Sequence, residues 1–597
     1  MQGTEKAAEP REARGLKGTD AWALALGVFA VALLMRVLFA GAGPDSAWPH
    51  ALAYKGDAYV WLNQVLANRS GQLFEAGLPL RPPGMPWLVD ALWDGTEGGI
   101  EGLKSWWRIM GAATCALLFL ALIRGFSVGV AAGTALLFAA SQGAMVLSHS
   151  INSETPYLLL VAASLACMPS GAERGLGRFV VFGILSAAAC LIRTEHALFL
   201  LAMLGWWLLP ASGMAPIWRT RLTGVTLATA AFLGALIPAH LTLWGKIERF
   251  NSGAHPVSPA TERAFERIER RTARLAWDEG ALENIASFPG FVRRSAGLFI
   301  AATAVHRKDP KVEVEDIGVL DEAFGAAPEP ITARPFISSY GPLNFYLAHH
   351  PNSGPGFSLE GLREPPPLLG GADRYPPDLI QGLPPERLSL EYLPHLRAFN
   401  HGYAMGLEAI TESPARFFSR SVSKLGVFWG GTALGFGGYG LPLGAEGVRR
   451  PVDLATPDHL WASIWRLLFG AAAAAGLVLG VLQRSGRAEL MPWLLFGASK
   501  VAVAVLFYGY ARHGVLIQPI VYLGLALAIE RWVVPRLAAS CPVRPAWCFL
   551  ACLLVVVAVE GSRRAMGTGA AVEAKGAAPV ERLAPEDSSE VRVRYGR

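Results

Sequence analysis

Apolar residues along the chain gather into blocks long enough to cross a lipid bilayer, which needs roughly 20 residues per helix. The first block, at about 21–40, is too long for a typical signal-peptide core, so we take it as a retained first span. The pattern predicts an all-α polytopic membrane protein with about eleven transmembrane helices, within a range of ten to thirteen. The blocks lie at about 21–40, 108–123, 126–147, 155–169, 178–193, 196–212, 223–244, 463–482, 490–509, 514–530 and 545–560.

Short loops between these blocks are rich in arginine, which predicts their orientation. If the N-terminus is cytoplasmic, every short loop on the inside is basic, as the positive-inside rule requires. Two large segments, at about 41–107 and 245–461, then lie outside. The Ala-, Gly- and Arg-rich composition is typical of a GC-rich bacterial genome, so we expect a multi-pass protein of the bacterial inner membrane with a periplasmic active face. The inside loops hold Arg124; Arg174 and Arg178; Arg219 and Arg221; Arg484 and Arg487; and Arg531, Arg536 and Arg544.

The same blocks divide the chain into five parts. A disordered cytoplasmic tail at 1–20 precedes an N-terminal transmembrane catalytic module at 21–244, which includes the external loop 41–107. Residues 245–461 are expected to form a large periplasmic loop or cap with interfacial helices, because an unstructured loop of that length would be unusual. The last two parts are C-terminal transmembrane helices at 462–560 and a disordered tail at 561–597.

The composition supports a membrane protein and argues against several other classes. Hydrophobic residues make up 52% of the chain and charged residues 17%, whereas a soluble protein has nearer a quarter charged. The net charge of +6 arises largely from the short loops, so it does not indicate nucleic-acid binding. The sequence contains no Walker motif, no G-x-G-x-x-G opening a helix, no H-E-x-x-H and no G-x-S-x-G. A nucleotide-driven pump or a protease is therefore poorly supported.

The first external segment contains a predicted short helix with a carboxylate at its start. Within 56–66, apolar residues share one face while Asn63 and Gln64 occupy the other, so we expect an amphipathic helix along the bilayer surface. Asp57 stands where an N-cap would, and capping is one interpretation. A catalytic carboxylate is the other interpretation, and the two are compatible.

A stiff segment follows, Leu80-Arg81-Pro82-Pro83-Gly84-Met85-Pro86. Because proline fixes its own backbone and restricts the residue before it, Arg81 projects from an extended stretch close to the membrane. A solvated surface arginine is one interpretation. A fixed contact with a phosphate is the other, since the guanidinium group matches phosphate geometry.

Further ionisable residues stand at the predicted external ends of spans. Glu154 follows the third block, Arg193 joins the fifth to the sixth, and Arg512 lies between the ninth and tenth. Charges at membrane depth are costly and usually functional, but at span ends snorkelling to water is the ordinary explanation. Several loops that deliver carboxylates and arginines to one face of the membrane favour a functional site more than any residue does alone.

Another helix is predicted from Ser413, with serine as the cap and Pro414 at the first helical position. Arg416, Arg420 and Lys424 recur every four residues and form a basic stripe. Anchoring of this helix to anionic lipid headgroups is one interpretation. A contact between Lys424 and a lipid-linked phosphate is the other.

Together these stretches resemble the C superfamily of membrane glycosyltransferases. The resemblance is closest to bacterial relatives of glycosyltransferase family 39, which includes protein O-mannosyltransferases and lipid A aminoarabinose transferases. Order and topology agree over roughly residues 20–530. Arg512 followed by Pro519 resembles the family's C-terminal Arg-to-Pro element. The other matching stretches are Gly56-Asp57-Ala58-Tyr59, Arg81-Pro82-Pro83-Gly84-Met85-Pro86, Gly183 through Arg193-Thr194-Glu195, and Ser413-Pro414-Ala415-Arg416-Phe417 through Trp429.

The resemblance implies roles for individual residues. Asp57 matches the first-loop carboxylate that acts as general base, and Glu154 lies where relatives often have a second acidic residue, so Asp57 and Glu154 are the expected catalytic residues. Arg81 matches the basic residue before Pro-Pro that holds the lipid phosphate in the aminoarabinose enzymes. The lipid-phosphate and donor-binding residues expected in this way are Arg81, Arg193, Lys424 and Arg512.

The sequence also departs from both groups of relatives. Ala58 follows Asp57 where the protein mannosyltransferases have Asp-Glu, and Leu80 stands where the aminoarabinose enzymes have an acidic residue. These differences leave the specific substrate open and weaken the transfer of any metal ligand. No metal site or certain cofactor is predicted; a divalent metal stays open, with His349-His350 as an external candidate.

The function that follows is an inverting glycosyltransferase. It would move a sugar from a polyprenyl-phosphate donor in the bilayer to a hydroxyl of a protein or glycolipid on the periplasmic side, without any nucleic-acid partner. Different alternatives on the same architecture are a non-catalytic membrane lipid-binding or scaffold protein and a lipid-sugar flippase. An oligosaccharide ligase or arabinosyl-type transferase is a further enzymatic alternative.

Overall fold

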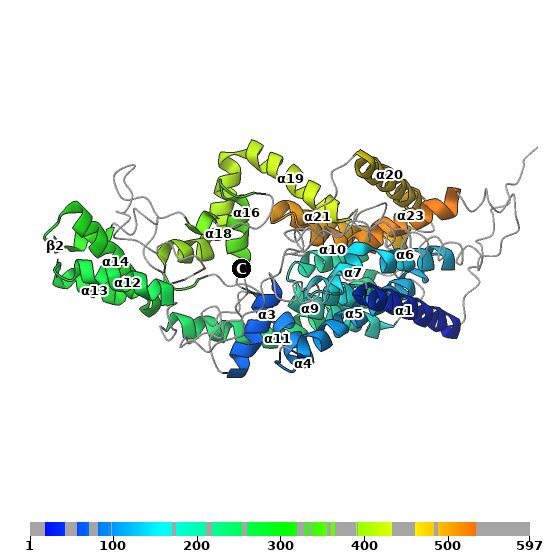
Figure 1. Cartoon of the computed structure of the whole chain (residues 1–597), viewed down its shortest axis with the longest axis horizontal. Coiled ribbons are helices and arrows are strands. Elements are labelled where there is room, and N and C mark those ends of the chain that lie inside the picture. The colour runs from blue at the N-terminus through cyan, green and yellow to red at the C-terminus, as the bar shows by residue number, and fades with distance from the viewer. Residues whose placement is uncertain are drawn as a thin grey trace, which may run out of the picture.

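The structure of the chain, a computed structural model, consists almost entirely of helices (Figure 1). They form two groups, each around a hydrophobic cluster of its own: a bundle and a cap. The expectation of an all-α membrane protein is confirmed. The structure describes residues 18–41, 57–70, 81–96, 98–169, 175–209, 218–252, 259–318, 329–332, 337–338, 340–354, 360–363, 388, 390, 392–432, 460–482 and 487–532.

The bundle contains the helices predicted as spans and the two short helices of the first external segment. The predicted blocks from 21–40 to 514–530 are helical, but the block 126–147 is divided at Ser141 into α6 and α7, and the block 514–530 covers the end of α22 and most of α23. Their bounds are α1 Gly18–Gly41, α3 Asp57–Ser70, α4 Gly84–Leu92, α5 Gly99–Leu122, α6 Val128–Ala140, α7 Gln142–Leu147, α8 Glu154–Cys167, α9 Leu176–Ile192, α10 His196–Leu208, α11 Trp218–Asn251, α20 Leu460–Leu482, α21 Arg487–Leu506, α22 Ala511–Val515 and α23 Gln518–Trp532.

Several of these helices have the length and composition of membrane spans. Among the described residues, four are long and apolar enough to cross a membrane: Thr19–Leu38, Gly99–Leu122, Trp218–Asn251 and Ala488–Leu506. Shorter apolar helices lie at Val128–Ala140, Glu154–Cys167, Leu176–Ile192, His196–Leu208 and Gly470–Leu482. The predicted last span at 545–560, most of the N-terminal tail and the C-terminal tail lie outside the described residues. The total of about eleven spans and the domain boundaries therefore stay predictions.

Helix α11 connects the bundle to the cap. Along this single helix Ala239 belongs to the bundle's hydrophobic cluster and Leu243, one turn later, to that of the cap. In the described part of the chain one pair of short parallel strands joins the helices, with Ala276 opposite Lys311. The other elements here are α12 Pro259–Thr272, β1 Ala276–Trp277, α13 Glu279–Ser287, α14 Gly290–Arg307, β2 Lys311–Val312, η3 Val314–Ile317, α16 Gly341–His349, α17 Glu360–Arg363, α18 Leu393–Glu412 and α19 Pro414–Thr432, which runs back to the bundle (Figure 1).

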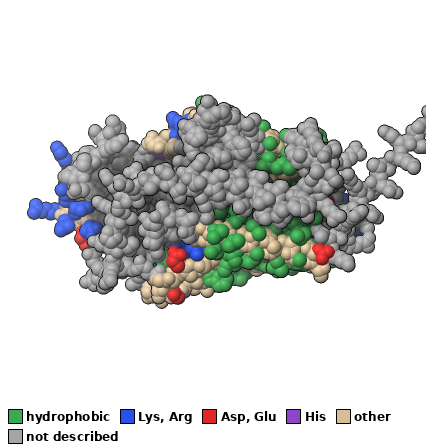
Figure 2. Space-filling view, turned by 45° about the vertical axis from the view of Figure 1, so that its right-hand side comes forward, with side chains coloured by type: hydrophobic (Ala, Val, Ile, Leu, Met, Phe, Trp, Pro, Cys, Tyr) green, Lys and Arg blue, Asp and Glu red, His purple; other side chains and the backbone are tan. Residues whose placement is uncertain are grey.

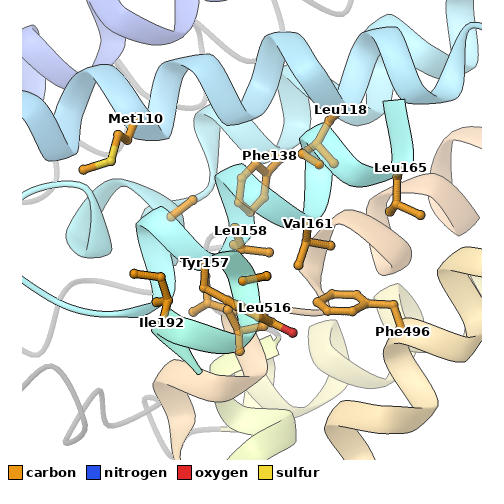
Figure 3. Packing of buried hydrophobic residues seen from close by; sticks show 14 of the residues in the cluster. Met110, Leu118, Phe138, Tyr157, Leu158, Val161, Leu165, Ile192, Phe496 and Leu516 are labelled. Carbon is orange, nitrogen blue, oxygen red and sulfur yellow. The ribbon is translucent and has the colours of Figure 1, made fainter. Parts of the chain in front are cut away.

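The core of the bundle lies around α8 (Figure 3). Tyr157, Leu158, Val161 and Leu165 follow the three- and four-residue spacing of one helix face, and all four are buried. Neighbouring helices supply the rest of the packing, so that α8 is fixed firmly and its first residue, Glu154, with it. The labelled partners in Figure 3 are Met110 and Leu118 of α5, Phe138 of α6, Ile192 of α9, Phe496 of α21 and Leu516.

On the face shown in Figure 2, hydrophobic side chains form a band over the described helices, while Lys and Arg are most frequent at the left-hand end of this view. Leu26, Leu201 and Leu241 are each more than 60% exposed. A contiguous apolar surface of this kind marks contact with something other than water, and along membrane-spanning helices that contact is lipid.

The helix predicted at the start of the first external segment is present as α3. Asn63, expected on its polar face, is instead fully buried, like Leu62 beside it. The reason is that α3 packs against α4 and the bundle, so that both sides of its middle turn are covered. This packing holds the first residue of the helix, Asp57, in a defined place.

Candidate active site

Four ionisable side chains predicted from the sequence meet at one end of the bundle. Asp57 begins α3, Glu154 begins α8, and Arg512 lies in the short helix α22. Arg193 follows α9 as its C-cap. The Asp57 carboxylate lies 2.6 Å from Arg512 Nη1, although the two residues come from opposite ends of the chain. The site is therefore assembled by the tertiary fold from four separate segments.

Glu154 lies at the centre of this cluster and is fully buried. Its Oε1 accepts a hydrogen bond of 2.7 Å from Arg193 Nη1. The same oxygen lies 3.2 Å from Arg512 Nε, an ion-pair contact outside hydrogen-bond geometry. Because a buried carboxylate is tolerated only when it is paired, the two arginines stabilise Glu154 and are held in turn by it.

The ion pairs continue from Arg193 away from Asp57. Arg193 Nε donates to the Glu195 carboxylate, which lies 3.5 Å from Lys500 Nζ of α21. The Lys500 ammonium lies 4.3 Å from the centre of the Tyr157 ring, within cation–π range. Carboxylates and cations thus alternate from Asp57 to Lys500. Each charge between these two ends has an opposite neighbour on either side, which fixes the arginines, and the three carboxylates balance the three cations.

His513 acts as a neutral hydrogen-bond acceptor in this cluster. Its Nε2 lies 2.7 Å from Arg193 Nη2, and arginine can only donate. Burial, followed by the charges of Arg193 and Arg512, lowers the pKa of the imidazole well below its ordinary value. The 3.7 Å contact between His513 and Glu154 is therefore not an ion pair. The ring instead gives Arg193 a further partner and restricts its orientation.

The carboxyl of Asp57 is held in its ionised form. Burial alone would raise its pKa, but the charges of Arg512, Arg81 and Arg193, together with the hydrogen bond from Arg512, outweigh burial and lower the pKa below its ordinary value. The side chain is 28% exposed, so Asp57 remains in contact with solvent. An accessible carboxylate that is ionised at neutral pH can accept a proton from a bound molecule.

Arg81 approaches the same end of the bundle from the residues that precede α4. Its guanidinium lies 5.6 Å from the centre of the Tyr340 ring, which belongs to the cap. Gly84 explains how the segment fits: a Cβ at this position would lie 2.6 Å from the carbonyl oxygen of Leu191. Only glycine allows α4 to begin so close to the end of α9, and the Pro-Pro-Gly sequence therefore places Arg81 near the turn that carries Arg193.

The structure does not bring Lys424 into this cluster. Its ammonium is buried and donates to the carbonyl oxygens of Ala348 and Val505, both at 3.3 Å. Burial, and to a lesser degree the charge of Arg420, lowers the pKa of Lys424 to about 8. A contact of Lys424 with a lipid phosphate stays a prediction, and its ammonium already has two partners elsewhere.

Three members of the cluster were not selected from the sequence. Glu195 lies two residues after Arg193 and His513 directly follows Arg512, so both belong to segments that the sequence marks at the ends of spans, but no role is predicted for either. Lys500 lies inside the predicted span at about 490–509. A lone lysine within an apolar helix is itself a signal of function or of a buried partner, and it could have been used.

The described residues offer no evident site for a metal ion. Among them, no group of three or more His, Cys, Asp or Glu side chains is arranged to hold one. His349, named as an external candidate, has its Nε2 2.9 Å from the carbonyl oxygen of Leu506.

Residues 80–240 match a protein family described as dolichyl-phosphate-mannose-protein mannosyltransferase. The match begins directly before Arg81 and includes both Glu154 and Arg193. Over this segment the chain is similar to membrane glycosyltransferases of the family 39 type. The resemblance seen in the sequence is thereby confirmed for the glycosyltransferase segment, whereas donor and acceptor are not decided by it. No curated protein is similar enough in sequence to count as a match.

Two solved structures are distantly similar to the chain. Both are of ArnT from Cupriavidus metallidurans, one in the apo state and one bound to undecaprenyl phosphate. The apo structure is 14% identical in sequence, with 86% of this chain and 78% of ArnT covered and a TM-score of 0.28. For the lipid-bound structure the identity is 13%, the coverage 88% and 80%, and the TM-score 0.27.

Proposed function

We propose that this glycosyltransferase moves a sugar from a polyprenyl-phosphate donor to a hydroxyl group of a glycolipid or protein at the periplasmic face of the membrane. The observation that supports this best is the cluster of Asp57, Arg512, Glu154 and Arg193 at one end of the bundle. A lipid carrier presents its phosphate at the bilayer surface, so a base and fixed cations are needed there. The family that residues 80–240 match is named for a sugar linked to a lipid phosphate, dolichyl-phosphate-mannose, which supports a polyprenyl-phosphate sugar as the donor.

In this proposal the arginines bind the donor phosphate. A phosphodiester carries one negative charge and gains another as the sugar leaves, so cations held in place stabilise the transition state more than the ground state. Arg512 and Arg193 are fixed by Glu154, and Arg81 reaches the same end of the bundle from the stiff segment before α4. Because their positions are set before the donor arrives, little reorganisation is required.

Asp57 accepts the proton in the proposed reaction. The acceptor hydroxyl attacks the anomeric carbon from the face opposite the phosphate, its proton passes to Asp57, and the bond from the anomeric carbon to the phosphate oxygen breaks with its electron pair. The configuration inverts. When the donor phosphate binds Arg512, the positive charge of Arg512 is divided between the phosphate and Asp57. Because Arg512 is the charge that lowers the pKa of Asp57 most, that pKa then rises. Asp57 then becomes a better base only once the donor is bound.

Asp57→Asn tests the base. Transfer from a panel of radiolabelled polyprenyl-phosphate sugars would be measured in membranes that contain equal amounts of folded wild type and variant. The expected result is transfer by wild type from at least one donor and a loss of about 10²-fold or more in the variant, the range for a positioned general base. Asp90→Asn is the matched control, because Asp90 lies in the same external segment but pairs with Arg69 at the surface.

The outcomes separate the proposal from its alternatives. Equal transfer by wild type and Asp57→Asn would remove Asp57 from the mechanism. Binding of the lipid donor without transfer by any preparation would favour a flippase or a lipid-binding scaffold. Loss in Asp90→Asn as well would show that the whole external segment, rather than one carboxylate, is required.

A further inference from the structure

Lys424 of α19 joins the C-terminal ends of two helices from different parts of the molecule. One of its carbonyl partners, Ala348, lies in the last turn of α16 in the cap, and the other, Val505, lies in the last turn of α21 in the bundle. The C-terminus of a helix carries roughly half a negative charge on its free carbonyls. Two such ends would repel each other, and the buried ammonium between them turns the repulsion into an attachment.

The residues that follow Val505 are held by α16 and α19. The carbonyl of Leu506 lies 2.9 Å from His349 Nε2, and the Tyr508 hydroxyl donates to the Asn344 carbonyl at 3.0 Å, both on α16. A Cβ on Gly509 would lie 2.2 Å from the Lys424 carbonyl oxygen, so this glycine permits direct backbone contact with α19. The segment 505–509 is thus fastened at successive residues to the cap and to α19.

The segment 505–509 is followed directly by Tyr510 and by α22, which contains Arg512, the arginine proposed to bind the phosphate. Tyr510 precedes α22, and its ring centre lies 5.1 Å from the Arg512 guanidinium. The position of Arg512 against Asp57 is therefore determined from two sides: by the carboxylates of the cluster and by the segment that Lys424 fastens.

We propose that Lys424 is a positioning residue for Arg512, through which the cap controls the geometry of the active site. Its ammonium does not contact the donor but keeps the 505–509 segment against α16. The role of Arg512 in binding phosphate rests on the proposed function, whereas the attachment of α21 to α16 by Lys424 does not. Without the ammonium, the carbonyls of Ala348 and Val505 lose their hydrogen-bond donor. The segment 505–509 then becomes more mobile, and Arg512 shifts. Small misplacements of a catalytic group can cost about 10²-fold in rate.

Arg420 provides a matched control on the same helix. It lies one turn before Lys424 and also binds the C-terminal end of α16, with 2.6 Å between its Nη1 and the His350 carbonyl and a further bond to the Pro351 carbonyl. Its guanidinium hydrogen bonds go to the carbonyls of His349, at the end of α16, and of the two residues after it, whereas those of Lys424 join α16 to α21. Loss of Arg420 weakens the end of the cap helix without releasing the 505–509 segment.

The test compares Lys424→Met, Lys424→Arg and Arg420→Met in the full-length protein in nanodiscs. Amide hydrogen exchange of residues 505–515 is measured alongside binding of undecaprenyl phosphate as the probe lipid. We expect Lys424→Met to raise exchange in 505–515 and to weaken probe binding at least tenfold. Lys424→Arg, which can donate to both carbonyls, should restore both quantities, and Arg420→Met should leave both near wild type.

Each outcome decides the proposal. Unchanged exchange at 505–515 in Lys424→Met, or an equal rise in Arg420→Met, would overturn it. Raised exchange with unchanged binding of a lipid that wild type does bind would also overturn it, since Arg512 would then not depend on the attachment. If wild type binds no lipid and transfers no sugar, the proposed function fails, and the exchange comparison alone still decides whether Lys424 fastens the segment.

Discussion

At the scale of single residues, the two carboxylates around Arg512 differ in what they can reach. Glu154 is fully buried and shares its oxygen with two arginines, whereas Asp57 is 28% exposed. Of the two carboxylates, an acceptor molecule can therefore approach only that of Asp57. Although both were expected to be catalytic, we propose that Asp57 takes the proton and that Glu154 holds Arg193 and Arg512 in position.

The pH dependence of transfer reports this arrangement. Arg512 lowers the pKa of Asp57, while burial alone would raise it, so replacement of Arg512 by glutamine should raise that pKa. Asp57 must be ionised to act as base, and the acid limb of kcat/KM should therefore move to higher pH in Arg512→Gln. Arg69→Gln, which alters the surface pair with Asp90, should leave the limb in place. An acid limb at the same pH in both variants would contradict the assignment.

At the scale of elements, the site depends on helix ends that approach one another closely. α3 and α8 present their first residues, α9 its C-cap, and α22 is a helix of five residues. Helix ends leave backbone groups without intrahelical partners, and here they also bring the four charged side chains into contact. Glycine at the contact between α4 and α9 is one condition for this convergence.

Gly84→Ala tests that condition. The added Cβ meets the Leu191 carbonyl at 2.6 Å, so α4 must shift, and we expect a loss of roughly 1–3 kcal/mol in stability together with weaker donor binding through Arg81. Gly102→Ala is the control: this glycine lies within α5 with nothing within 4 Å of its Cβ, and alanine there should stabilise the helix slightly. The measurements are thermal unfolding in detergent and the KM for the donor. Equal behaviour of both variants would argue against a close contact at Gly84.

At the scale of the whole molecule, the predicted orientation places the cluster outside the cytoplasm. Asp57, Glu154, Arg193 and Arg512 all come from predicted external ends and do meet at one end of the bundle. This agreement supports a common face for these segments. The side of the membrane on which that face lies is a proposal that rests on the basic loops.

Labelling of single cysteines checks the orientation. In a variant without the native cysteines, Ser70→Cys in α3 should react with a membrane-impermeant thiol reagent in intact spheroplasts. Arg124→Cys should react only after permeabilisation. Both residues are exposed, so access to solvent does not distinguish them. The reverse pattern would invert the topology and place the site in the cytoplasm.

The sequence predicted the helices better than it predicted their contacts. Hydropathy located the blocks because a bilayer imposes a minimum apolar length, and it separated α8 from α9 and α10. It could not show that Lys424 binds carbonyls of two other helices, since both partners are backbone atoms far away in the chain. Lys500 was not predicted because one charged residue changes the mean hydropathy of a long apolar block only slightly. Its partner Glu195 lies two residues after Arg193, which was predicted.

The pairing of Asp57 with Arg512 has a consequence for how the enzyme is made. Translation proceeds from the N-terminus, and membrane helices are inserted as they are synthesised. A nascent chain that has completed residues 80–240 holds Glu154, Arg81 and Arg193 but still lacks Arg512. Until α21 and α22 are inserted, Asp57 lacks its ion-pair partner Arg512, and Lys424 lacks its carbonyl partner on α21. A product truncated before α22 therefore contains the segment that matches the family but lacks the pair of Asp57 and Arg512.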